Sequence, residues 1–247
     1  MRYALLVLVG FIAGVQNALA GGGSFLTFPA LLLFGAGARA ANITSTVALF
    51  PGQVTTGLAG RNYVAGIEGL SFRTLAAISL VGGALGAGLL LATPESFFRL
   101  LVPFLILFAT GLFAWGSFGG GAGVRLRRIG PRSAAITQGF IAIYGGYFGG
   151  GIGMLMLAVL TIAGLSVRVA GATKNVLNAI LNCSAVAVFA FSPDVHWGAV
   201  ASLGAGAVVG GQVGAWALAR VNEHVLRAGI VVIGLALSAA MFWKAFG

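Results

Sequence analysis

Two glycine runs decide the fold that this sequence encodes. The first ends the stretch Phe11-Ile-Ala-Gly-Val-Gln-Asn-Ala-Leu-Ala-Gly-Gly-Gly23, and the second ends Phe140-Ile-Ala-Ile-Tyr-Gly-Gly-Tyr-Phe-Gly-Gly-Gly151. Each run interrupts an apolar segment that would otherwise continue as a helix. Glycine lets the backbone turn sharply and lets other groups approach it closely. Inside a membrane, such irregular backbone is tolerated only where it is buried in protein or lines a water-filled cavity.

A secretory signal is the alternative explanation of the first run. Arg2 would supply the charged region, Tyr3 to Val15 the apolar region, and Ala18-Leu-Ala20 an A-x-A cleavage site. The second run lies in the middle of the chain, where signal peptidase does not act, so a structural role is favoured for both. A mature protein that began at Gly21 would support cleavage instead.

The composition is that of a polytopic membrane protein. Of 247 residues, 59% are hydrophobic, and the charged residues are 14 Lys and Arg and 4 Asp and Glu. The net charge of +10 would suggest nucleic acid in a soluble protein, but cytoplasmic loops of membrane proteins collect Lys and Arg. We therefore expect no nucleic-acid partner. Cys183 is the only cysteine, so no disulfide framework or CxxC metal pair is indicated.

Apolar runs between charges and turn residues predict two sets of helices. In each set the second segment is too short to cross roughly 30 Å of hydrocarbon, which needs about 20 helical residues. A polar connection, 119–132, separates a first repeat, 1–118 with a hairpin over 3–36, from a second, 133–247 with a hairpin over 133–165. The predicted helices are 3–20, 24–36, 40–60, 73–93 and 98–118, then 133–149, 152–165, 169–191, 197–219 and 224–246.

Further matches indicate that the two sets are one repeated pattern. Arg39-Ala-Ala-Asn-Ile-Thr-Ser45 returns as Arg168-Val-Ala-Gly-Ala-Thr-Lys174, which places Ser45 opposite Lys174. Glu95 falls opposite Glu223 at nearly the same offset. Aligning the ends of the two glycine runs requires a gap of one residue, and Pro29 and Pro51 have no counterpart.

If each glycine run is the tip of a hairpin that returns to its own face, each half crosses the membrane three times and the second half is inverted. Loop charges divide nine against four, which puts the first group in the cytoplasm and both termini outside. The fold class is therefore all-α, with two inverted repeats, each a re-entrant glycine-tipped hairpin plus three transmembrane helices. That organisation is typical of secondary transporters. The nine charges are Arg61, Arg73, Arg125, Arg127, Arg128, Arg132, Arg168, Arg220 and Arg227, and the four are Arg2, Arg39, Arg99 and Lys244.

The sequence resembles the TauE/SafE sulfite exporter family, also called TSUP, over essentially its whole length. The resemblance rests on Gly14-x6-Gly-Gly-Gly-x5-Pro29-x-Leu31, on Ala41-Asn-Ile-Thr-Ser45, on the second glycine run and on Ala170-Gly-Ala-Thr-Lys174. It implies a bacterial inner-membrane exporter of sulfite or organosulfonates, with two inverted repeats whose first elements are hairpins that do not fully span. The unmatched prolines mean that the two hairpins need not bend alike.

An anion that crosses a membrane loses water, so the protein must supply hydrogen-bond donors and positive potential. A new helix is expected to start after each glycine run, at Ser24 and near Ile152, and free N–H groups there would form an anion site. The alternative is that these glycines only permit tight helix packing. The glycines concerned are Gly21, Gly22 and Gly23 in the first run and Gly149, Gly150 and Gly151 in the second.

Lys174 is the most informative single residue, because it lies within the apolar run from Val169 to Phe191. An intramembrane charge is costly and usually functional, although Lys174 could instead snorkel to the surface. Amides and hydroxyls at helical spacing complete the candidate set. The predicted substrate-binding residues besides the glycines are Ser24, Asn42, Thr44, Ser45, Gln53, Thr173, Lys174, Asn175 and Asn178, with Thr46 and Asn182 as neighbours on the same segments.

Four other residues leave two readings open. Gln16 and Asn17 are expected either to face the same cavity or to hydrogen-bond across helices, and Tyr144 and Tyr147 either to line it or to pack. We expect His196 and His224, with all four carboxylates, to lie near the surfaces. That placement argues against an acid-based proton pump and a two-carboxylate hydrolase.

We therefore expect no enzyme activity, no metal and no cofactor, and no ATP-binding motif is present. The reading that best fits the sequence is export of a small sulfur-containing anion by alternating access, with the lipid bilayer as surroundings and a homodimer as the possible assembly. An importer of thiosulfate, sulfate or another anion is the first alternative. An intramembrane scaffold that helps assemble other membrane proteins is the second.

Overall fold

The structure is a computed structural model that describes residues 2–19, 22–118, 129–217 and 223–246. These residues form an all-α fold, as the sequence predicts, and most helix ends lie within about three residues of their expected positions. A short 3-10 turn, Arg61–Tyr63, follows the third helix. The helices are α1 Arg2–Leu19, α2 Ser24–Phe34, α3 Ala38–Gly60, α4 Phe72–Ala92, α5 Glu95–Phe118, α6 Pro131–Tyr147, α7 Ile152–Ile162, α8 Val167–Phe189, α9 Trp197–Ala217 and α10 Glu223–Phe246.

Local sequence signals explain several of the helix starts. Ser71 accepts a hydrogen bond from Thr74 N and caps α4, and Ser166 accepts one from Val169 N and caps α8. Pro131 occupies the first turn of α6, where its missing N–H costs nothing. The predicted connection 119–132 therefore ends slightly earlier than expected, and 119–128 lie outside the described residues.

One helix of the described chain, α4, is long and apolar enough by length and composition to cross a membrane. The helices α3 and α8 have 23 residues each, but polar side chains such as Asn42 and Lys174 lower their hydropathy. The helices α2 and α7 have 11 residues each, which is roughly 16 Å at 1.5 Å per residue. Each is therefore about half as long as a bilayer core is thick.

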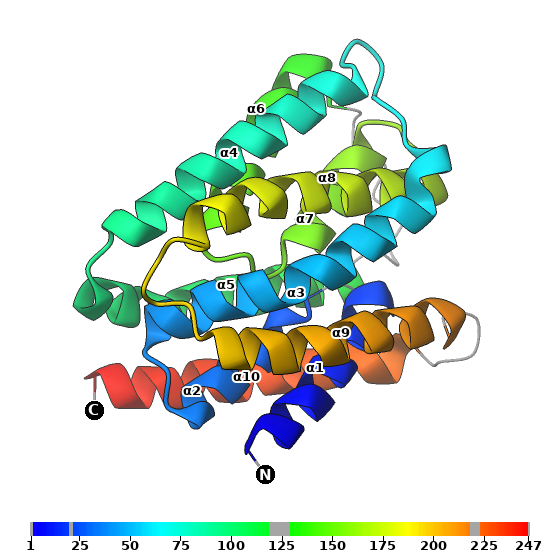
Figure 1. Cartoon of the computed structure of the whole chain (residues 1–247). Coiled ribbons are helices and arrows are strands. Elements are labelled where there is room, and N and C mark those ends of the chain that lie inside the picture. Colours follow the sequence, from blue (N-terminus) through cyan, green and yellow to red (C-terminus); the bar gives the residue numbers. More distant parts are fainter. Residues whose placement is uncertain (1, 20–21, 119–128, 218–222, 247) are drawn as a thin grey trace.

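Helix packing in the two halves follows one scheme (Figure 1). The α3 helix packs on α8 at the centre, α1 packs on α9, and α6 packs on α4. The α9 helix also contacts α3 while α4 contacts α8, and α5 pairs with α10. If five is added to the number of each helix in the first half and subtracted from each in the second, most of these pairs are converted into one another. The pair α1–α9, for example, corresponds to α6–α4. The first five helices and the last five therefore make equivalent contacts.

Small residues let two helix pairs approach closely. Along α1 and α9, Gly10 lies against the backbone of Leu203 and Gly210 against the backbone of Phe11. Along α4 and α6, a Cβ atom at Gly82 would come within 2.5 Å of the Ala142 Cβ. The glycine-rich stretches of the sequence therefore serve the close packing that membrane helices obtain from small residues.

The helix ends define two faces of the molecule. We call them the Arg39 face, where α3 and α9 begin and α8 ends, and the Arg61 face, where α3 ends and α8 begins. The α1–α2 pair starts and ends at the Arg39 face, because a Cβ at Gly198 would lie 3.1 Å from the Tyr3 hydroxyl and one at Gly37 2.9 Å from the Glu95 carboxylate. The α6–α7 pair approaches from the Arg61 face, where Pro131 lies beside Gly69.

Backbone conformation corrects the expected register between the two halves. Gly22 and Gly151 have φ of 80° and 75°, and Gly35 and Gly164 have φ of 104° and 107°. Both pairs have the same separation in the sequence as Arg39 and Arg168, so the expected gap between the two repeats is wrong. We call two residues at this separation equivalent. Positive φ is strained for any residue with a Cβ, so these glycines are required by their turns.

Candidate functional site

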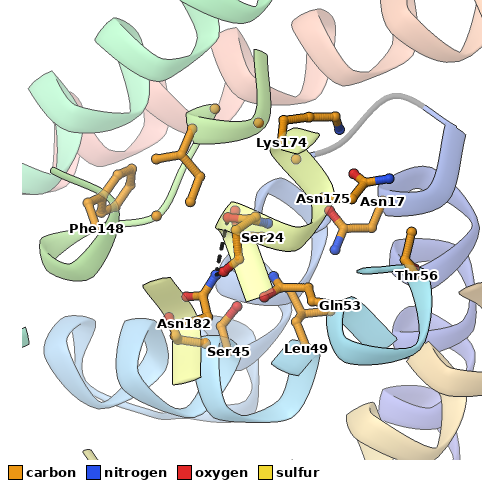
Figure 2. Close-up of a pocket in the computed structure, with 17 residues that line it drawn as sticks. Asn17, Ser24, Ser45, Leu49, Gln53, Thr56, Phe148, Lys174, Asn175 and Asn182 are labelled. Atoms are coloured by element: carbon orange, nitrogen blue, oxygen red, sulfur yellow. Dashed lines mark hydrogen bonds between the residues drawn. The ribbon is translucent and has the colours of Figure 1, made fainter. Parts of the chain in front are cut away.

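A cavity of about 40 Å³ lies where the two glycine turns meet α3 and α8 (Figure 2). On a comparable measure a single water needs roughly 10–15 Å³, so about three water-sized groups fit. The lining is rich in amides and hydroxyls. It comprises Asn17, Gly22, Ser24, Ser45, Thr46, Leu49, Gln53, Thr56, Phe148, Gly149, Gly151, Ile152, Gly153, Lys174, Asn175, Asn178 and Asn182.

The second glycine turn presents the start of α7 to this cavity. Gly151 is the N-cap in the left-handed conformation, and no side chain caps the helix. The first N–H groups of a helix lack acceptors within it, and here they belong to the cavity-lining residues Ile152 and Gly153. The N-terminus of α7 therefore offers hydrogen-bond donors and the positive end of the helix dipole to the cavity.

Lys174 lies directly across from that helix start. A Cβ atom at Gly153 would be 3.5 Å from the Lys174 Nζ, so the absence of a side chain at Gly153 leaves room beside the ammonium group. Lys174 lies two turns into α8, which is roughly 10 Å from the helix end. Lys174 is one of the residues that line the cavity.

The first glycine turn is arranged differently. Asn17 Oδ1 accepts a hydrogen bond of 3.1 Å from Gly23 N, and Gln16 Nε2 donates one of 2.7 Å to Gly22 O. Gly23 is the N-cap residue of α2, and no side chain caps α2 either, so Asn17 holds the turn that precedes the helix. The equivalent of Asn17 in the second half is Gly146, which has no side chain to hold the second turn in this way.

Neutral polar groups of α3 form the opposite wall (Figure 2). Ser45 Oγ and Thr27 Oγ1 are 2.5 Å apart and share a hydrogen bond. Gln53 also lines the cavity, and its Oε1 is buried without a hydrogen-bond partner. On α8, Asn182 Nδ2 donates to the backbone and side-chain oxygens of Asn178. Apart from Lys174, the described lining is uncharged.

Several predicted binding residues lie away from the cavity. Thr44 Oγ1 donates to Asp194 O and accepts from His196 N, and Thr173 Oγ1 accepts from Ala65 N and donates to Ala65 O. These hydroxyls hydrogen-bond to part-buried backbone groups of the loops, which explains why they are not free for a ligand.

The remaining predicted residues lie either in the first glycine turn or beside a second, smaller cavity. Gly23 is buried in the first turn, and Gly21 lies outside the described residues. Asn42 and Gly150 line a smaller neighbouring cavity of about 10 Å³. In addition, Asn42 Nδ2 donates a 3.0 Å hydrogen bond to Tyr147 O.

Sequence reasoning did not identify Leu49, Thr56, Phe148 and Gly153 as candidate lining residues. Gly153 had a usable signal, because it is the equivalent of Ser24, which was predicted. The polar residue Thr56 shares a helix face with Gln53 at helical spacing. Leu49 and Phe148 are apolar, and only the tertiary structure places them in the lining.

The structure also shows whether Tyr144 and Tyr147 line the cavity or pack against other side chains. Tyr144 packs edge-on against Phe108, and Tyr147 packs edge-on against Phe98 while its hydroxyl donates to Thr93 Oγ1 at 3.3 Å. Both are packing residues. His196 is exposed beside α9, whereas the side chain of His224 lies outside the described part. Among the described residues, no group of three or more His, Cys, Asp or Glu could hold a metal ion.

Comparison with known proteins places this architecture. The family model described as sulfite exporter TauE/SafE matches residues 6–241. This chain belongs to the TauE/SafE family. Its relatives include a probable membrane transporter protein of Haemophilus influenzae, 29% identical over 97% of this chain and 94% of that protein.

Two further relatives have the same general character. The probable membrane transporter protein ORF9 of a Sinorhizobium species is 32% identical over 95% of this chain and 90% of its own length. The probable membrane transporter protein YfcA of Escherichia coli K12 is 26% identical over 98% of this chain and 90% of its own length. No solved structure matches the chain. The family and these names support a membrane location and the transporter class for this chain.

Proposed function

We propose that this chain is an inner-membrane secondary transporter that exports a small sulfur-containing anion, sulfite or an organosulfonate, by alternating access. The observation that carries the proposal is the convergence of Lys174 and the uncapped start of α7 on one small polar cavity. The substrate class comes from the family description.

The two groups suit a dehydrated oxyanion. An ammonium group supplies three donors and a full positive charge, and the N–H groups of Ile152 and Gly153 supply directed donors with a favourable dipole. Amides of Asn175 and Asn178 on the same wall can add further donors. One cation surrounded by neutral donors can bind an anion and still release it, whereas several cations would bind the anion too tightly for release.

The volume favours a compact substrate. A cavity of about 40 Å³ accommodates roughly three water-sized groups, which is on the scale of the three oxygens of sulfite. An organosulfonate would fit with its sulfonate group at Lys174 and its organic part directed out of the cavity. The volume therefore limits the size of the anionic group and not the length of the organic part.

Membrane energetics favour export. With the cell interior negative, outward movement of one negative charge gains about 2.3 kcal/mol per 100 mV. Uptake of the same anion would need a coupling ion, and no carboxylate lines the described cavity to hold a cation. The excess of Lys and Arg assigned to the Arg61 face supports a cytoplasmic Arg61 face and periplasmic termini.

Inverted repeats are part of this proposal. Support comes from the approach of the α1–α2 pair from the Arg39 face and of the α6–α7 pair from the Arg61 face, and from the common separation of the left-handed glycines in the two halves. Half-length helices that meet near the middle of the fold are the usual site of binding in such transporters. We also propose a homodimer, which light scattering of the purified protein would test.

Efflux from liposomes tests the function. Liposomes that hold the purified protein would be loaded with labelled sulfite or one of a series of sulfonates at potentials set with valinomycin, with Lys174→Met as the test variant. Arg99→Met removes a charge from an exposed position of α5 and is the matched control. We expect saturable, voltage-driven efflux that Lys174→Met abolishes and Arg99→Met retains.

Other results would redirect the assignment. Uptake that depends on a proton or sodium gradient would favour an importer of thiosulfate or sulfate. Failure of every anion to move, with a well-folded protein, would favour the scaffold function.

A further inference from the structure

Arg39 connects three elements at the Arg39 face. Its Nε donates to Asp194 Oδ2 at 2.8 Å, its Nη1 donates to Thr93 O at 2.9 Å, and its backbone N donates to Glu95 Oε2 at 3.1 Å. Asp194 belongs to the α8–α9 connection, Thr93 belongs to the α4–α5 turn, and Glu95 is the first residue of α5. One residue therefore ties the start of α3 to both neighbouring connections.

A second layer of hydrogen bonds lies beneath this junction. Thr44, further along α3, bonds to the backbone of Asp194 and His196. Asn42 donates to Tyr147 O, and the Tyr147 hydroxyl donates to Thr93. The whole Arg39 face is thereby connected across α3, the α6 tip and both connections.

The cavity below this layer is more exposed toward the other end. Ser45 and Asn182, at the end nearer the Arg39 face, are 1% and 3% exposed. Thr56, Lys174 and Asn175, which lie nearer the Arg61 face along their helices, are half-buried, as is Thr46 beside Ser45. The burial of Ser45 and Asn182 beneath the hydrogen-bonded layer favours access from the Arg61 face.

The equivalent position at the Arg61 face is built differently. Arg168, the equivalent of Arg39, is exposed, and its guanidinium lies 4.5 Å from the centroid of the Tyr63 ring. The start of α8 is capped by its own Ser166, whereas the start of α3 receives the carboxylate of Glu95 from another element. Among the described residues, the Arg39–Asp194 contact is the only ion pair.

We propose that Arg39, Asp194 and Glu95 form the gate that closes the Arg39 face, and that the structure is the state in which the cavity is accessible from the Arg61 face. This inference rests on the proposed transport function. Release at the Arg39 face then requires Arg39 to leave Asp194 and Thr93 while α3 separates from the two connections. Each side chain of the ion pair is about a quarter exposed, 23% and 24%, so solvent can replace the pair when the gate opens.

Thiol accessibility tests the gate without reference to any substrate. Cys183 is exposed and is the only cysteine, so Cys183→Ala gives a cysteine-free background. Ser45→Cys then places one thiol at the closed end of the cavity, and Thr46→Cys provides a second reporter. Labelling rates would be measured with a charged, membrane-impermeant thiol reagent added to one side of oriented vesicles.

Two exposed positions calibrate the sidedness. Ser96→Cys marks the Arg39 face and Asn62→Cys marks the Arg61 face, each in the same background. We expect the cavity thiols to react from the side that labels Asn62→Cys and to be protected from the side that labels Ser96→Cys.

Asp194→Asn then opens the gate. Loss of the ion pair should raise labelling of Ser45→Cys from the Ser96 side at least about fivefold, the lower end of typical conformational coupling. Asp194→Glu retains the charge and should remain close to the parent. Size-exclusion profiles would confirm that each variant is folded. Arg39→Gln removes the other partner of the same ion pair and tests the gate independently.

The inference is overturned if the parent labels equally from both sides, or if neither Asp194→Asn nor Arg39→Gln changes labelling from the Ser96 side. Anion efflux would report separately on the function. Altered labelling without efflux supports the gate and contradicts the proposed substrate, while efflux without altered labelling supports the function and contradicts the gate.

Discussion

Thr44 and Thr173 are equivalent residues, and each hydrogen-bonds the connection that follows the other's helix. Thr44 on α3 binds Asp194 and His196 after α8, and Thr173 on α8 binds Ala65 after α3. The relationship is reciprocal, because Ala65 and Asp194 are themselves equivalent in the repeat. The two crossed helices that carry the cavity are therefore fastened at both ends by the same contact.

The threonine contacts should make a measurable contribution to stability. Thr44→Val and Thr173→Val each leave a part-buried loop N–H without its acceptor, which costs about 1 kcal/mol, the lower end of the range for an unsatisfied buried group. Thermal unfolding in detergent would check this. Thr161→Val is the control, because Thr161 is exposed and donates only to its own helix, and it should change the midpoint little. Equal midpoints for all three variants would contradict the assigned role.

Gly22 and Gly151 should not tolerate a side chain. Gly22→Ala and Gly151→Ala force a residue with a Cβ into the left-handed region, at a cost of about 1–2 kcal/mol each. Gly88→Ala, within α4 and with no atom within 4 Å of an added Cβ, is the matched control and should be neutral or stabilising. Circular dichroism melts of the three variants would separate turn strain from helix propensity.

Close packing of α1 and α9 should be sensitive to volume. Gly210→Val drives a side chain into the Phe11 backbone and is expected to destabilise the protein by about 1–3 kcal/mol or more. Gly211→Ala, at the next residue with open space around it, should be tolerated. Yields of monodisperse protein and unfolding midpoints would check the pair, and an unaffected Gly210→Val protein would show that the helices can separate.

Charge in the cavity should control anion transport. Asn17→Asp keeps the acceptor for Gly23 N but adds a negative charge to the cavity lining. Repulsion of an anion in this half-buried site should lower kcat/KM for efflux at least about tenfold, equivalent to about 1.4 kcal/mol. Asn62→Asp, at an exposed position outside the cavity, should leave efflux unchanged. A transport rate insensitive to Asn17→Asp would place the anion elsewhere.

The helices, the repeated pattern and the candidate polar positions could all be predicted from local features of the sequence. Apolar runs and their breaks are local signals, so the helices follow from them, and Lys174 stands out because a charge within an apolar run is costly. Which of these polar groups are free for a ligand depends on how the helices pack. Thr44, Asn42 and Thr173 share the composition of a binding site, yet they serve backbone groups 105 or more residues away.

The proposed gate shows most clearly that contacts between distant residues cannot be predicted from local sequence. Arg39 and Asp194 are 155 residues apart, and nothing in the local pattern of either segment signals the other. Secondary structure arises from neighbours along the chain, whereas the pairing of polar groups depends on how whole helices cross. The left-handed turns at Gly22 and Gly151 precede the short helices α2 and α7, which pack on α3 and α8 respectively.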